Sequence, residues 1–93
     1  MRSRYTAFAR GDAAYLSRTW ACETRPERID LDPEVSWRRL EILGTLAGGS
    51  QDEEGWVSFA AYYRHDGDRG MLRERSRFVR RDGDWYYVEG RIG

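Results

Sequence analysis

The second half of the chain alternates hydrophobic and polar residues with the period of two that is typical of β-strands. Four segments show this pattern, at residues 37–46, 56–65, 71–81 and 85–92. The Asp-Gly dipeptides at positions 66–67 and 82–83 separate the last three segments, and such dipeptides favour two-residue hairpin turns. The pattern therefore predicts a four-stranded antiparallel meander.

The phase of this alternation predicts which side chains face the core. One face collects mainly aliphatic positions: Leu40, Ile42, Val57, Phe59, Ala61, Phe78, Tyr86 and Val88. The opposite face carries aromatic residues interleaved with arginines, namely Trp37, Trp56, Tyr62, Trp85 and Tyr87 with Arg39, Arg73, Arg75 and Arg77. Because a large apolar surface is rarely left in water, we expect this outer face to contact a partner.

The first twenty residues show helical spacing instead. Tyr5 and Phe8 lie on one apolar helical stripe, which predicts a helix over residues 1–10. Gly11 is a typical helix-terminating residue and Asp12 a typical N-cap, so a second helix is predicted over residues 12–20. Prolines then interrupt regular structure, with at most one helical turn after the first of them. Helices followed by a meander indicate an α+β fold.

Composition narrows the functional classes. The chain has 93 residues, which is the size of one domain, here residues 1–93. Its 16 arginines balance 16 acidic residues, and this net charge of zero argues against nucleic acid or an anionic membrane as a partner. It contains no lysine and one cysteine, Cys22, which excludes lysine nucleophiles and internal disulfides. No apolar run reaches the roughly 20 residues of a membrane span, and no secretory signal opens the chain, so a cytoplasmic protein is expected.

Glu74 is the residue that fits the pattern least, because it places a carboxylate on the predicted core face of strand 71–81. One interpretation is a structural ion pair with Arg2 or Arg4 of the first helix, and this is the interpretation that we favour. The other is a cavity-lining general acid or base, whose pKa burial would raise.

Two further groups of residues are candidates for binding. A small-ligand pocket around Glu74 would use aromatic side chains that could equally build the core: Tyr5, Tyr15, Trp20, Tyr63 and Tyr86. A homodimer interface on the outer face would use Trp56, Arg73, Arg75, Arg77, Trp85 and Tyr87. The alternatives for this face are a solvated surface with local ion pairs, or a nucleic-acid strand, which the zero net charge disfavours.

Several segments resemble motifs of the central domain of the YchJ-like family: residues 1–8 (MRSRYTAF), 11–20 (GDAAYLSRTW), 74–78 (ERSRF) and 85–90 (WYYVEG). The resemblance implies a cystatin-like α+β fold of the nuclear transport factor 2 superfamily, in which helices pack in the concavity of a curved antiparallel sheet. It implies a bacterial protein and no particular activity.

This chain also departs from the family. Many members carry Cys-rich SEC-C zinc motifs beside this domain, and this chain has none; Cys22 and His65 alone cannot form a four-ligand zinc site, so we expect no metal and no cofactor. Met1 stands where members have an internal methionine, which suggests an excised or truncated domain. We therefore expect a binding module for a small ligand or a protein, without catalysis; the alternative is a small cavity-type enzyme that uses Glu74 as its general acid or base.

Overall fold

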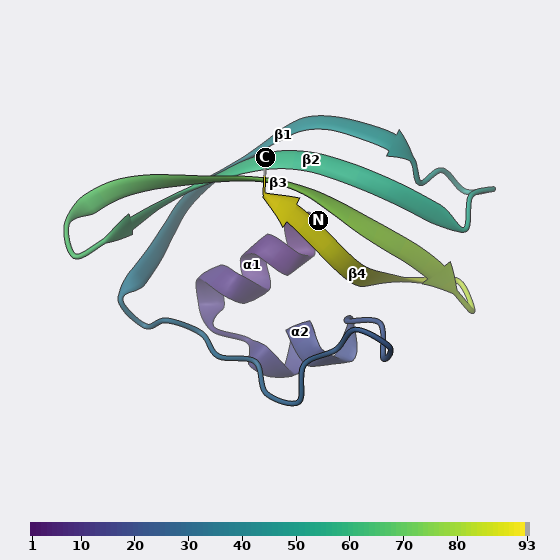
Figure 1. Ribbon diagram of the computed structural model, residues 1–93, viewed down its shortest axis with the longest axis horizontal. Helices are drawn as coiled ribbons and strands as arrows, with labels where there is room; N and C mark the ends of the chain where they lie inside the picture. Colours follow the sequence, from purple (N-terminus) through teal and green to yellow (C-terminus); the bar gives the residue numbers. More distant parts are fainter. Residues whose placement is uncertain (93) are drawn as a thin grey trace.

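The computed structural model describes residues 1–92 as two short helices and one curved antiparallel sheet. Helices α1 (Arg2–Arg10) and α2 (Ala13–Arg18) precede the strands β1 (Val35–Ala47), β2 (Glu54–His65), β3 (Asp68–Arg81) and β4 (Asp84–Ile92). The four strands pair in sequence order, β1-β2-β3-β4. Figure 1 shows both helices on the concave side of the sheet. The predicted α+β meander with its helices in the concavity is confirmed.

The corner between the helices forms as the sequence predicts. Gly11 adopts the left-handed conformation that ends α1, with φ of 71°. The side chain of Asp12 then caps α2, because its Oδ1 accepts a hydrogen bond from the backbone N–H of Tyr15 at 3.0 Å. The helical turn considered after Pro26 is not formed, and residues 19–34 run as loop, apart from a β-bridge at Trp20, until β1 begins. No helix within residues 1–92 is long and apolar enough to cross a membrane.

Both predicted hairpins are also present. Asp66 and Gly67 connect β2 to β3 with φ angles of 51° and 83°, and Asp82 and Gly83 connect β3 to β4 with 53° and 85°. Positive φ at both central positions is the geometry of the tight turn that suits the twist of a hairpin. The side chains of β2 and β3 therefore keep the predicted alternation.

Irregular pairing changes the faces of the two outer strands. The register of β1 shifts between Trp37 and Arg39, so Trp37 turns toward the helices, where its ring lies 6.1 Å from that of Tyr5. In β4 one extra residue lies opposite the bond between Arg77 and Phe78 of β3. Tyr87 therefore faces inward, and the centroid of its ring lies 5.8 Å from that of Phe78. A bulge of this kind reverses which residues point to each side.

These bulges correct four predictions. Trp37, Trp85 and Tyr87 were predicted on the outer face and lie on the concave side, where Trp85 and Tyr87 line one cavity together. Tyr86 was predicted on the concave face and lies on the outer face, because successive side chains of a strand point to opposite faces and both neighbours of Tyr86 are concave.

The segment after α2 covers the edge of β4. The backbone N–H of Ala21 donates to the Tyr87 carbonyl at 2.7 Å, and the N–H of Tyr87 donates to the Thr19 carbonyl at 2.9 Å. The Thr24 hydroxyl adds a bond to the Val88 carbonyl at 2.6 Å. This pairing places the Trp20 ring 4.9 Å from that of Tyr87, on the concave side.

Candidate functional site

The concave side of the sheet contains a cavity of about 260 Å³ next to α1, which we call the inner cavity. Its apolar walls come from α1, the loop after α2 and three strands: Tyr5, Phe8, Trp20, Trp37, Phe59 and Leu72. Polar groups of Arg4, Glu74 and Tyr87 line it as well, together with Met1. A second cavity of about 430 Å³ shares Met1, Arg4 and Tyr87 with the inner cavity. The stack of Arg4 on Tyr87 therefore borders both cavities.

Arg4 is buried in the middle of this arrangement, with 7% of its surface exposed. Its guanidinium carbon lies 3.6 Å from the ring centroid of Tyr87, 4.6 Å from that of Trp20 and 5.1 Å from that of Phe8. Burial lowers the pKa of Arg4, although a guanidinium stays protonated in proteins. Its Nη1 atom is buried and has no hydrogen-bond partner among the described residues. Aromatic faces therefore hold a buried cation, one nitrogen of which lacks an acceptor within the described residues.

Trp20 carries a second buried donor, its indole Nε1, that lacks a hydrogen-bond partner among the described residues. The ring meets Tyr87 edge-on, at an interplanar angle of 87°, and lines the inner cavity. Buried donors without an acceptor are rare in native proteins, so two of them beside one cavity need a physical explanation.

Glu74 points into the inner cavity from β3. Its Oε2 accepts a hydrogen bond of 2.7 Å from the hydroxyl of Ser76, which is fully buried. The carboxylate occupies the space left open by Gly90, because a Cβ atom there would lie closer than 3.0 Å to Glu74 and to the Tyr87 hydroxyl. Glu74 and Tyr87 therefore bring a carboxylate and a phenol to the same place.

The predicted ion pair between Glu74 and Arg2 or Arg4 is not formed. No side-chain nitrogen of either arginine approaches the carboxylate within 4.0 Å. Arg4 stacks on the rings of Tyr87 and Trp20 instead, and Arg2 is exposed on α1. The two charges still act on each other through space, since Glu74 partly offsets the lowering of the Arg4 pKa.

Two tyrosines beside the cavity have raised pKa values. Burial raises the pKa of Tyr87, the negative charge of Glu74 raises it further, and the nearby guanidinium of Arg4 opposes both. Burial also raises the pKa of Tyr5. Both phenols therefore keep their protons, and remain donors, to a higher pH than an exposed tyrosine.

The predicted pocket residues divide between different places. Tyr5, Trp20 and Glu74 line the inner cavity, whereas Tyr15 lines the second cavity. Tyr63 lies outside both, with its ring 5.4 Å from Trp37. Sequence reasoning missed Trp37 and Tyr87, because bulges are not visible in the alternation. It also missed Arg4 as a cavity residue, and the Arg-Ser-Arg motif was the only available signal.

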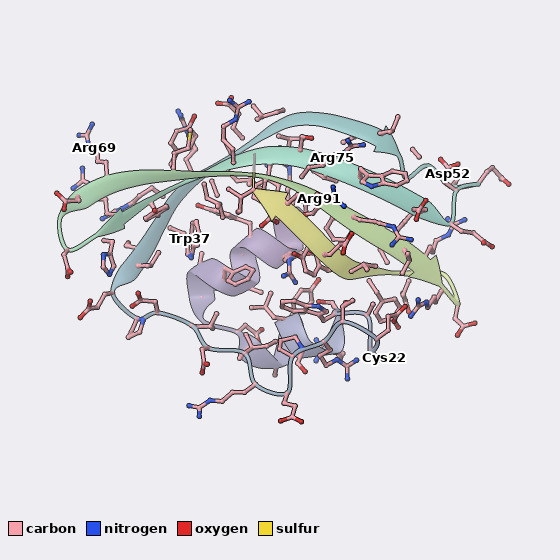
Figure 2. The ribbon with its side chains drawn as sticks, in the orientation of Figure 1. Cys22, Trp37, Asp52, Arg69, Arg75 and Arg91 are labelled. Atoms are coloured by element: carbon pink, nitrogen blue, oxygen red, sulfur yellow. The ribbon has the colours of Figure 1, made fainter. Side chains whose placement is uncertain are left out.

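Four of the residues predicted for an interface lie on the outer face: Trp56, Arg73, Arg75 and Arg77. Arg75 lies over the Trp56 ring at 5.7 Å, and Arg77 donates from Nε to Glu54 Oε2 at 2.6 Å. Arg73 lies on the same face, two residues before Arg75. Figure 2 shows arginines such as Arg75 on the side opposite Trp37. Trp85 and Tyr87 are absent from this face.

A surface group of metal-ligand type was not predicted. Asp32, Glu34 and His65 bring ligand atoms within 4.8 Å of one another, and His65 Nε2 lies 3.5 Å from a carboxylate oxygen of each. Both carboxylates are exposed, and exposed acidic groups commonly gather without an ion. We assign no metal to this group. Cys22 is exposed on the loop after α2 (Figure 2).

Comparisons with known proteins agree with this architecture. The sequence model described as "YchJ, middle NTF2-like domain" matches residues 1–90. A UPF0225 protein of Streptomyces coelicolor is 54% identical over 90 residues, which cover 97% of this chain and 69% of that protein. A UPF0225 protein of Streptomyces avermitilis is 53% identical over 90 residues, which cover 97% of this chain and 61% of that protein. This chain thus spans about two thirds of the length of these bacterial relatives.

A solved structure shares the fold. The solution structure of RPA3114, a SEC-C motif containing protein from Rhodopseudomonas palustris, superposes with a TM-score of 0.85 at 34% sequence identity. The match covers 100% of this chain and 75% of that protein. That protein therefore shares the arrangement of two helices in the concavity of a four-stranded sheet. The chain belongs to the family of YchJ middle domains, which have the nuclear transport factor 2-like fold.

Proposed function

We propose that this domain binds a small molecule in the inner cavity and does not transform it. The observation that supports this proposal is the lining of the inner cavity, in which aromatic rings surround the side chains of Arg4, Glu74 and Tyr87. A ligand that covers these rings removes apolar surface from water, and this burial favours binding.

The lining of the inner cavity suits the same role. Ligand pockets combine mainly apolar walls with a few converging polar groups, and this cavity combines aromatic rings with Arg4, Glu74 and Tyr87. Its volume of about 260 Å³ is smaller than most pockets for drug-sized molecules. We therefore expect a ligand of one or two rings. We also propose a cytoplasmic location, as expected from the sequence.

A fragment screen by ligand-observed NMR tests the proposal. Ala61 is 2% exposed and lines the inner cavity, so Ala61→Leu fills part of it. We expect ring-containing fragments to bind the unmodified chain and to lose binding in this variant. Ala9→Leu is the matched control, because Ala9 is exposed on α1. Fragment binding that survives Ala61→Leu unchanged contradicts the proposal.

Acid–base catalysis by Glu74 is the second candidate function. It is favoured by the lack of an ion pair at Glu74 and by the closeness of the Tyr87 hydroxyl. In that case a bound molecule with an acidic C–H bond would exchange its proton for deuterium in D₂O, and Glu74→Gln would stop the exchange while binding persists. An exchange rate equal in Glu74→Gln and the unmodified chain would exclude this role.

A further inference from the structure

The outer face of the sheet carries three arginines at alternate positions of β3, Arg73, Arg75 and Arg77, which we call the arginine row. Arg77 already binds a carboxylate, because its Nε donates to Glu54 Oε2 at 2.6 Å. Arg73 and Arg75 are exposed, and neither has a carboxylate oxygen within 4.0 Å in residues 1–92. Two of the three guanidiniums therefore lack an anionic partner among the described residues.

The charges around Arg75 favour an additional anion. Arg91 of β4 lies directly opposite Arg75, and like charges in that position destabilise a sheet. The two arginines line a hollow of about 240 Å³ together with Trp56, Arg77 and Glu89. Even when Glu54 is counted with its partner Arg77, the three arginines of this hollow exceed its carboxylates by one charge. A bound anion would reduce the repulsion between Arg75 and Arg91.

Aromatic rings orient the guanidiniums of this face. Arg75 lies over the Trp56 ring at 5.7 Å, and Arg39 of β1 lies over the Tyr62 ring at 4.3 Å. A guanidinium that stacks on a ring keeps the N–H groups of its edge for a carboxylate, which it can bind through two hydrogen bonds. The rings also offer apolar surface to a partner. The outer face therefore combines oriented positive charges with apolar contact area.

The spacing of the arginine row matches that of an extended peptide. Arg73 and Arg75 lie two residues apart on one strand, so their Cα atoms are about 6.6 Å apart. Alternate side chains of a second extended chain have the same spacing and point to one side. Acidic residues at alternate positions of such a chain therefore meet successive arginines, as Glu54 meets Arg77.

A nucleic-acid strand suits this face less well. Its phosphates follow one another at every nucleotide, whereas Glu41 on β1 and Glu89 on β4 interrupt the positive charge on either side of the row. The net charge of the chain is zero, so the whole molecule adds no attraction for a polyanion. A peptide can place carboxylates opposite the arginines and neutral residues elsewhere.

We infer that the outer face binds an extended, acidic segment of a partner protein, which carries carboxylates at alternate positions. These carboxylates accept hydrogen bonds from Arg73 and Arg75, and an apolar side chain beside them contacts Trp56. A second copy of this chain is not the partner, because the same face would oppose arginine with arginine. The inference does not rest on the proposed function, since the inner cavity lies on the other side of the sheet.

Three synthetic peptides with capped ends test the inference. All consist mainly of threonine, which favours an extended chain. One has two glutamates separated by a single residue, one has the two glutamates adjacent, and one has glutamines in place of the separated glutamates. Binding is followed through the indole N–H signal of Trp56, assigned with Trp56→Phe.

We expect the peptide with separated glutamates to bind about threefold more tightly than the adjacent isomer. Neighbouring side chains of an extended chain point to opposite sides, so the isomer engages one arginine at a time. We expect it to bind about tenfold more tightly than the glutamine peptide, which forms no ion pair.

Replacement of both open arginines, in the double variant Arg73→Gln and Arg75→Gln, should remove this preference. The peptide with separated glutamates should then bind as weakly as the glutamine peptide. The matched control is the double variant Arg2→Gln and Arg10→Gln, because it removes two exposed arginines from α1 on the other side of the sheet. Both variants change the net charge equally, and the control should keep the preference of the unmodified chain.

Several results would overturn the inference. Equal binding of the two glutamate peptides would show that the face does not recognise their spacing. Equal weakening in the two double variants would indicate general attraction between charges, and a lack of binding by all three peptides would exclude an acidic segment. A single-stranded oligouridylate that binds more tightly than the peptides, and that depends on Arg73 and Arg75, would identify a nucleic-acid surface instead. The comparison of Ala61→Leu with Ala9→Leu tests the proposed function separately.

Discussion

The guanidinium carbon of Arg4 lies 3.6 Å from the centroid of the Tyr87 ring, which joins α1 to β4 across the concavity of the sheet. This stack borders both cavities and holds a buried cation that forms no ion pair with the described carboxylates. It also replaces the helix–sheet ion pair that the sequence predicted. The properties expected of this domain follow largely from these two residues and from Glu74 beside them.

Replacement of Arg4 by methionine should affect binding much more than stability. The lost cation–π contacts, of about 0.5–2 kcal/mol, oppose the gain from no longer burying an unpartnered charged donor, of about 1–3 kcal/mol. Urea denaturation should therefore show a change in unfolding free energy within about 1 kcal/mol, while the binding of ring-containing fragments is weakened, because Arg4 lines the inner cavity. Arg2→Met, on the exposed side of α1, is the control. A loss above about 3 kcal/mol with intact binding would indicate a purely structural role.

Gly90→Ala should displace the Glu74 carboxylate, because the added Cβ would lie closer than 3.0 Å to it. We expect a loss of about 1–3 kcal/mol in unfolding free energy, the usual cost of overpacking. Gly44→Ala is the control, since a Cβ there meets nothing within 4 Å and should change stability by less than about 1 kcal/mol. Equal effects of the two substitutions would contradict the close approach of Glu74 to Gly90.

The raised pKa of Tyr87 predicts a loss of stability in alkali. A raised pKa in the folded state contributes stability that is fully present below the unfolded value of about 10 and is lost as the pH rises through the folded pKa. Denaturation curves at increasing pH should show a steeper decline for the unmodified chain than for Tyr87→Phe. Tyr62→Phe, on the outer face, controls for the loss of one tyrosine. Parallel declines would contradict the burial of the Tyr87 hydroxyl.

The ion pair of Glu23 with Arg81 predicts a different effect in acid. Arg81 donates from Nη1 to Glu23 Oε1 at 2.8 Å, and this bond lowers the pKa of Glu23 to about 2. A lowered pKa contributes stability above the unfolded value of about 4.3 that is lost as the pH decreases through about 2. Both side chains are nearly half exposed, so salt should weaken the effect.

Carboxyl carbon NMR measures the Glu23 titration directly. The midpoint should lie well below that of an ordinary glutamate and should return toward about 4.3 in Arg81→Gln. Arg80→Gln, one residue earlier, is the control. An unchanged midpoint in Arg81→Gln would mean that the pair does not form in solution.

Self-association through the outer face should be weak. Trp85 and Tyr87 point into the concavity. The predicted interface residues on the outer face are therefore Trp56, Arg73, Arg75 and Arg77. Two copies that oppose the same arginine-rich face repel each other. We expect sedimentation equilibrium to give a monomer. A dimer that dissociates in Arg75→Glu would instead support the homodimer predicted from the sequence.

The local features of the fold could be predicted because they depend on few residues. Gly11 and Asp12 set the corner between the helices through their own backbone and capping preferences. Asp66-Gly67 gives its hairpin for the same reason, and with the turn fixed the register of β2 and β3 follows. Glu74 was therefore placed correctly on the concave face, and its position there was the best indication of a site.

Other parts of the site could not be predicted because they depend on pairing between distant segments. A bulge adds one residue opposite a partner strand, and the alternation of a single strand does not show where this happens. Trp37 and Tyr87 were consequently placed on the wrong face, and Tyr86 took the place of Tyr87 in the predicted pocket. The partner of Glu74 was wrong because the aromatic surface that attracts Arg4 is assembled only in the folded chain.

The order of the elements, the turns between them and the concave position of Glu74 follow from the amino-acid sequence, since helix caps, turn residues and strand periodicity act over a few positions. The stacking of Arg4 on Tyr87 and Trp20, and the gathering of these residues with Glu74 around one cavity, arise when the chain is folded. Burial and the distance between charges are properties of packed surfaces, and those surfaces come from α1, β3, β4 and the loop after α2 together.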